Sequence, residues 1–192
     1  MRRPRLRWTS FAVVTAFVFF GTWGAIERQD FFLASWREHQ RELASILDAV
    51  PAVRTGTAVM LRGTPPPTRY IATEADYLTT HWLWLLYNDS NLPTFRLDPH
   101  RGATCQPTAL GLACVPEGQE ISYDNKKRER FFRFDALVIL DYDQTSGTWR
   151  LLRSLQSDPL ARGHEAEAER YRPSDRIIER PLTLRQRRLL LR

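Results

Sequence analysis

The sequence predicts an α+β fold in which one membrane-spanning helix runs into an amphipathic stalk helix, followed by a small mixed β-sheet domain with a buried aromatic helix and a β-hairpin. Three observations support this prediction. Residues 8–26 carry no charge. Residues 32–50 repeat apolar side chains at helical spacing. From residue 58 onward, short apolar runs alternate with turn residues, as in a sheet.

The uncharged segment 8–26 follows four arginines in residues 1–7 and precedes Glu27 and Arg28. As a helix it rises about 28 Å, close to the roughly 30 Å hydrocarbon core of a bilayer. Since positive flanks stay in the cytoplasm, we expect residues 1–7 to be a cytoplasmic tail of a single-pass protein of the cell membrane, and the chain after Ile26 to be extracytoplasmic. A cleaved signal peptide and a buried helix of a soluble protein are the alternatives.

Residues 27–50 are predicted to form a juxtamembrane amphipathic helix that ends at Pro51. Its apolar side chains recur at steps of three or four: Phe32, Trp36, His39, Leu43, Leu47 and Val50. Because no Gly or Pro lies between residues 25 and 50, the span and the stalk are expected to form one continuous helix. The stalk packs on the domain or, as the alternative, pairs with a second copy as a coiled coil.

Residues 51–180 are predicted to form the extracytoplasmic α+β domain. Strands are expected at 58–61, 95–97, 110–115, 120–123, 136–142 and 148–152. A helix from Thr73 to about Tyr87 begins with a capping-box spacing and is apolar on nearly all sides, which indicates a helix that is buried or lies on lipid. The unbroken apolar run 136–140 indicates a central strand covered on both faces. Residues 143–147 form the Gly-containing turn of a β-hairpin.

The net charge of +6 is concentrated at the two ends of the chain. Residues 1–7 and 172–192 hold 11 of the 28 Lys and Arg residues and two of the 22 acids, so the residues between them carry a net charge of −3. A nucleic-acid partner is therefore not expected, because such proteins concentrate positive charge on the folded body. His164 to Tyr171 are expected to form a short charged surface helix. The basic C-terminal tail 181–192 docks on the domain, lies on an anionic membrane or is disordered.

Two pairs of residues are candidates for chemistry or covalent structure. Cys105 and Cys114 are expected to form a structural disulfide, because the predicted topology places them in an oxidising compartment. Asp141 and Asp143 follow an apolar strand as a D-x-D, an arrangement that holds a divalent cation in metal-dependent glycosyltransferases; alternatively, both acids begin the turn and face water.

The remaining residues indicate no reaction. The four histidines have no metal-ligand spacing, and His81, in the aromatic helix, is expected to be a core residue. No metal or cofactor is expected, and an enzymatic activity is not indicated.

A series of landmarks resembles a known type of membrane protein. The predicted span is followed by Trp36, Gln40 and Arg41, and the first apolar strand is preceded by Pro51 and Gly56-Thr57. The D-x-D turn is followed by the return strand Trp149-Arg-Leu-Leu152 and then by Ser174 to Ile177. Over about residues 25–180 this is similar to the extracytoplasmic C-terminal region of large multi-pass bacterial membrane proteins, some of which look like membrane glycosyltransferases. The resemblance implies an accessory domain without the catalytic membrane part.

We therefore expect a membrane-anchored extracytoplasmic accessory or interaction domain of a bacterial envelope. Its partners would be the lipid bilayer and a multi-pass membrane protein. The alternative is a subunit or fragment of a glycosyltransferase-like enzyme acting on envelope glycans or lipids.

Overall fold

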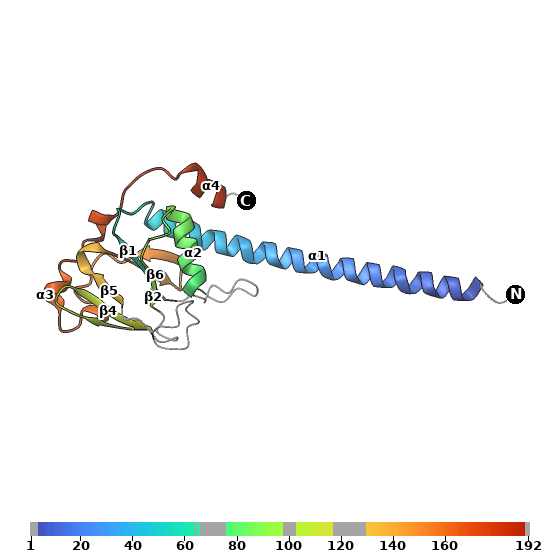
Figure 1. The fold of residues 1–192 in the computed structure, drawn as a ribbon, viewed down its shortest axis with the longest axis horizontal. Coiled ribbons are helices and arrows are strands. Elements are labelled where there is room, and N and C mark those ends of the chain that lie inside the picture. Colours follow the sequence, from blue (N-terminus) through green and yellow to red (C-terminus); the bar gives the residue numbers. More distant parts are fainter. Residues whose placement is uncertain (1–3, 64, 66–75, 98–102, 117–129, 191–192) are drawn as a thin grey trace.

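The longest element of the computed structural model is the helix α1 (Pro4–Ala49), which projects from the domain as a single rod (Figure 1). The structure describes residues 4–63, 65, 76–97, 103–116 and 130–190, with the backbone alone at 4–12, 76–80, 103–104 and 116. The 46 residues of α1 rise about 69 Å. The prediction of one unbroken helix through residue 49 is confirmed, and the chain is α+β with a small mixed-sheet domain.

A four-stranded sheet in the order β2-β1-β6-β7 forms the centre of the domain. Its strands are β1 (Ala58–Arg62), β2 (Thr94–Leu97), β6 (Leu137–Asp143) and β7 (Thr148–Leu151). β1 is parallel to both β2 and β6, whereas β6 and β7 form the predicted antiparallel hairpin. Leu137 to Leu140 are all fully buried, which confirms the expected central strand.

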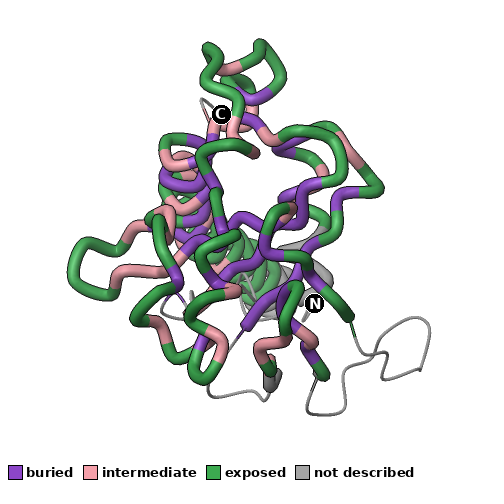
Figure 2. The backbone as a smooth tube through the Cα atoms, turned by 90° about the vertical axis from the view of Figure 1, so that its left-hand side faces the viewer, coloured by how far each residue is buried: buried purple, intermediate pink, exposed green. Residues whose placement is uncertain are grey.

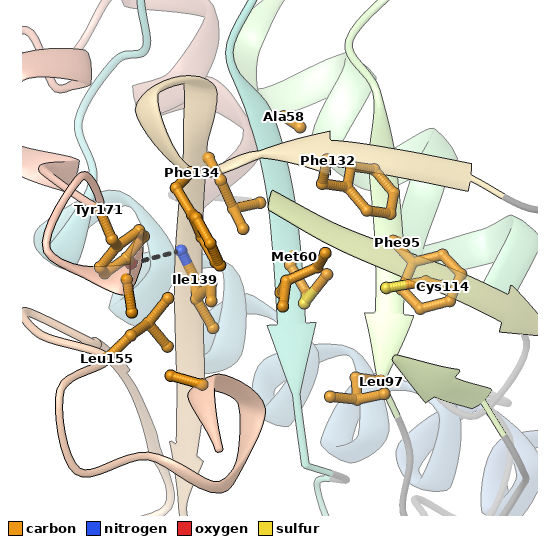
Figure 3. Packing of buried hydrophobic residues seen from close by; sticks show 14 residues of the cluster. Ala58, Met60, Phe95, Leu97, Cys114, Phe132, Phe134, Ile139, Leu155 and Tyr171 are labelled. Atoms are coloured by element: carbon orange, nitrogen blue, oxygen red, sulfur yellow. Dashed lines mark hydrogen bonds between the residues drawn. The ribbon is translucent and has the colours of Figure 1, made fainter. Parts of the chain in front are cut away.

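Alternate residues of the central strands face two different hydrophobic layers. Val59 and Leu61 of β1 face the helices α1, α2 (Asp76–Tyr87) and α4 (Leu184–Leu190). Ala58 and Met60 face the opposite layer, where Figure 3 shows Met60 beside Ile139 and Phe95. Buried residues accordingly gather in the middle of the domain (Figure 2). The sheet is therefore covered on both faces, as its unbroken apolar strands require.

The second layer contains a three-stranded antiparallel sheet in the order β3-β4-β5. Its strands are β3 (Ala103–Pro107), β4 (Gly111–Pro116) and β5 (Arg130–Arg133). The predicted strand 110–115 corresponds to β4, whereas the predicted strand 120–123 and the Thr73 cap lie outside the described residues. Short helices complete this layer: η1 (Phe134–Ala136), η2 (Pro159–Ala161), α3 (Glu165–Ala168) and η3 (Pro173–Arg176).

The expected surface helix at 164–171 is wrong in extent and in exposure. Only Glu165–Ala168 are helical, and Tyr171 is 1% exposed in the core. The hydroxyl of Tyr171 donates to the carbonyl of Leu152 at 2.8 Å and accepts from the amide of Ile139 at 3.0 Å. It therefore lies between the strands at the point where the β6–β7 ladder ends, and Figure 3 shows the bond to Ile139.

The basic tail docks on the domain through α4. Gln186 is 1% exposed, and its amide nitrogen donates to the carbonyls of Pro51 at 3.3 Å and Leu86 at 3.0 Å. Gln40 of α1 donates to the carbonyl of Leu189 at 3.1 Å. These contacts bind the tail to α1, to Pro51 just after it and to the end of α2, so the first of the three predicted alternatives, docking on the domain, agrees with the structure.

Candidate functional site

The edge at which β1 and β6 end is one candidate site. The chain that leaves β1 leads to β2, its neighbour on one side, and the chain that leaves β6 leads to β7 on the opposite side. The two connections therefore diverge between the parallel strands β1 and β6. In open parallel sheets, ligands bind outside the carboxyl ends of strands at such a point. Arg62 and Asp141 occupy this edge as directly paired residues.

Arg62 binds two aspartates there. Its Nε and Nη2 donate to the two oxygens of Asp141 at 2.5 and 2.6 Å, and its Nη1 donates to both oxygens of Asp158 at 2.7 Å. Asp158 also accepts from the amide of Leu160 at 3.0 Å and so caps η2. This cluster ties β1 and β6 to the chain that follows β7.

The electrostatics of this cluster favour a structural role. Burial acts to lower the pKa of Arg62, but hydrogen bonds and charge from Asp141 and Asp158 outweigh it and raise the pKa above its ordinary value. The guanidinium is therefore always charged, and the three side chains carry a net charge of −1. Sequence reasoning did not single out Arg62 and Asp158. A charged residue directly after the apolar run 58–61 was the available signal for Arg62.

Asp143 has partners of its own in the hairpin turn. Its Oδ1 accepts from the amide of Thr145 at 2.9 Å, its Oδ2 accepts from the hydroxyl of Ser146 at 2.9 Å, and Arg150 pairs with Oδ2 at 2.7 Å. The hydrogen bonds from Thr145 and Ser146 are the main causes that lower the pKa of Asp143. The two acids of the D-x-D are thus each bound to different groups. Within the described ranges, no three His, Cys, Asp or Glu side chains gather as a metal site.

Cys105 and Cys114 lie directly opposite each other on β3 and β4, with Cα atoms 4.0 Å apart, and their sulfurs are bonded. The predicted pairing is confirmed. Cys114 is fully buried in the core and Cys105 is half-buried, which is the environment of a structural disulfide.

The histidines differ from the prediction. His81 is exposed on α2 and its ring packs against Trp84, with ring centroids 5.2 Å apart, so its prediction as a core residue is wrong. Among the described histidines, the buried one is His39 of α1, which is 5% exposed and lies on the predicted apolar face of the stalk. The hydrophobicity of α2 misled the prediction, because α2 buries the face of Leu83 and Leu86 and exposes the face of His81 and Leu85.

The N-terminal part of α1 carries the most extensive apolar surface among the described side chains. Ten large apolar side chains between residues 13 and 33 are 50–79% exposed: Val13, Val14, Phe17, Val18, Phe19, Phe20, Trp23, Ile26, Phe32 and Leu33. Residues 17–20 are consecutive and all exposed, so this surface surrounds the helix. Within the part of the chain that the structure describes, no helix meets the length and hydropathy required to cross a bilayer.

Comparisons of the chain with protein-family models, with curated proteins and with solved structures find no match. The functional argument therefore rests on the chain itself.

Proposed function

We propose that this chain is a single-pass, membrane-anchored accessory or interaction domain of a bacterial envelope, with its N-terminus in the cytoplasm and its folded domain outside. The observation that carries the proposal is the apolar surface of α1 between residues 13 and 26. Leaving one large apolar side chain in water rather than burying it costs about 1.5–3 kcal/mol. Eight such side chains in this stretch make an aqueous environment unfavourable.

The distribution of these side chains favours lipid over a protein partner. A partner helix covers one face of α1, whereas Phe17, Phe19 and Phe20 point in different directions around the helix axis. Lipid chains cover all faces at once. The four arginines in residues 1–7 and the charges from Glu27 onward then mark the two ends of the span, with the arginines on the cytoplasmic side.

The described charged groups of the domain support an accessory role, because they bind one another or stabilise a turn. Arg62, Asp141 and Asp158 neutralise one another in part, and Asp143 stabilises a turn. The stalk face with Trp36, His39, Leu43 and Leu47 packs into its own domain, so this face does not support the coiled-coil alternative. α1 thereby holds the domain at a fixed orientation outside the membrane, where a multi-pass protein is the expected partner.

The second candidate function is a subunit of a glycosyltransferase-like membrane enzyme. The observation in its favour is the sheet edge at Arg62 and Asp141, which is the usual ligand-binding position of parallel sheets. Purification of the chain in mild detergent separates the two functions. A stoichiometric multi-pass enzyme that loses activity without this chain supports the second function, and a multi-pass partner whose activity does not depend on this chain supports the accessory domain.

The anchor itself is tested by alkaline extraction of membranes. We expect the full chain to stay in the membrane pellet, and alkaline phosphatase fused after Arg192 to be active, because this reporter works only outside the cytoplasm. Phe17→Arg with Phe20→Arg should release the chain, since each arginine near the middle of a span costs about 2.5–3.5 kcal/mol. Gln29→Arg, beyond the apolar stretch, is the control and should leave the chain in the pellet. A wild-type chain in the soluble fraction refutes the anchor.

A further inference from the structure

The outer side of α4 carries three exposed side chains that lie next to one another. Leu184 is 75% exposed, and Arg187 and Arg188, which follow it by three and four residues, are both exposed. Side chains at these spacings are neighbours on a helix surface. The opposite side of α4 is docked, because Gln186 is buried and residues 189–190 pack against the core. The tail is therefore held on the domain while these two arginines face solvent.

Two more arginines lie beside α4, on the part of α1 that enters the domain. Gln40 donates to the carbonyl of Leu189 at 3.1 Å, so this part of α1 lies against the last turn of α4 (Figure 1). Arg37 and Arg41 are three residues before and one residue after Gln40, and both are exposed. We refer to the exposed side chains contributed by the two helices as the basic face: Arg37, Arg41, Leu184, Arg187 and Arg188.

The four arginines of the basic face are not used within the described part of the chain. None of their guanidinium groups forms a hydrogen bond or an ion pair there. Arg185, by contrast, donates to the side chain of Asn88 and so helps to hold α4 at the end of α2. The exposed acids on the same stretch of α1 are Glu38 and Asp48, so four arginines stand against two acids. The surface is therefore positively charged, and its charges are available to a partner.

The chemistry of the basic face fits an acidic polypeptide segment that also carries apolar side chains. Guanidinium groups bind carboxylates through paired N–H donors. Leu184 lies between the two arginines of α4 and offers an apolar contact, which a chain of phosphates does not use. A long polyanion would also extend past this face, where residues 8–171 hold 17 basic and 20 acidic residues and so repel it. A short acidic segment avoids that repulsion.

We propose that the basic face is the docking site for an acidic segment of a partner protein, with carboxylates bound by Arg187 and Arg188 and an apolar side chain placed on Leu184. Arg37 and Arg41 extend the positive surface along the stalk and attract the segment before it docks. Because these charges are at the surface, they act mainly on the rate of association and on its dependence on salt. The inference rests on the interaction role proposed above, but not on the membrane anchor.

The test measures binding of a fluorescent peptide of repeated Glu-Glu-Leu to the full chain in uncharged detergent, by anisotropy at about 0.15 M salt. A peptide of repeated Gln-Gln-Leu is the neutral match, and inorganic polyphosphate is the competing polyanion. The variants are Arg187→Ser with Arg188→Ser, and Leu184→Ser; all three side chains are exposed, so the variants should fold. The matched control is Arg153→Ser with Arg162→Ser, two exposed arginines elsewhere on the domain.

We expect the wild-type chain to bind the acidic peptide and not the neutral one, and to bind it more weakly as the salt concentration rises. Arg187→Ser with Arg188→Ser should weaken binding about five- to tenfold and reduce its dependence on salt, because two exposed charge pairs are lost. Leu184→Ser should weaken binding about threefold, and the control should match the wild type. Absence of binding, equal binding by the two double variants, binding of the neutral peptide, or tighter binding of polyphosphate overturns the proposal. A chain that fails this test but co-purifies with a multi-pass protein loses the basic face as the docking site and keeps the proposed function.

Discussion

Replacing Tyr171 by Phe isolates the effect of one hydroxyl group in the core. The ring stays, so the packing in the second layer is kept, while both hydrogen bonds of the hydroxyl are lost. Burial raises the pKa of Tyr171 above its ordinary value, so the hydroxyl remains a donor across the pH range in which the protein is handled.

The expected loss in free energy of unfolding is set by the two backbone groups that lose their hydrogen-bond partner. The amide of Ile139 is in a fully buried residue, whereas Leu152 is half-buried, so water can reach its carbonyl more easily. A buried donor or acceptor left without a partner costs about 1–3 kcal/mol. We expect Tyr171→Phe to lower the free energy of unfolding by about 2–4 kcal/mol.

Guanidinium unfolding of the full chain in mild detergent measures this change, and amide hydrogen exchange locates it. Tyr142→Phe is the neutral control, and Tyr87→Phe, which loses the single bond to the buried carbonyl of Val50, should cost about 1–3 kcal/mol. The Ile139 amide should exchange faster in Tyr171→Phe than in the wild type. A loss below about 0.5 kcal/mol with unchanged exchange at Ile139 refutes the role given to the hydroxyl.

Three further changes test other parts of the fold. Arg62→Leu leaves two carboxylates without their cation and should cost about 2–4 kcal/mol in guanidinium unfolding; an unchanged midpoint contradicts the ion-pair argument. Gly111→Ala places a Cβ 2.0 Å from the carbonyl oxygen of Phe132, a backbone atom, so we expect a loss of at least about 3 kcal/mol or no folded protein, and wild-type yield and stability refute this. Reduction of the Cys105–Cys114 disulfide with dithiothreitol opens a loop of about ten residues and should cost about 2–3 kcal/mol, and an unchanged unfolding midpoint contradicts a stabilising disulfide.

The elements that could be predicted are those specified by short-range patterns. The helical repeat from residue 32 to residue 50 and the absence of Gly and Pro between residues 25 and 50 determine the second half of α1. The apolar run before Asp141 and the Gly147 turn determine the β6–β7 hairpin. Gly147 has a φ of +66°, a conformation that glycine adopts without strain, which is why its position marks the turn.

The rest depends on contacts between distant residues. The parallel pairing of β1 with β6 joins segments that no local pattern connects. Tyr171 was assigned to the surface because its neighbours are charged, although its hydroxyl completes the ladder between two strands. His81 was misjudged because the face that a helix buries depends on what packs against it, and the average hydrophobicity of a helix does not reveal this.

The position of β1 also has a consequence for the order of events during biosynthesis. Arg62 and Asp141 are 79 residues apart, and β1 cannot acquire its second neighbour before β6 has been made. At about 5–20 residues per second, the ribosome takes roughly 4–16 s to cover that interval. The hairpin closed by Cys105 and Cys114 can form within it, but the central sheet cannot. The domain therefore completes its fold only after β6 has been made, and a chaperone that shields β1 during this interval should raise the yield.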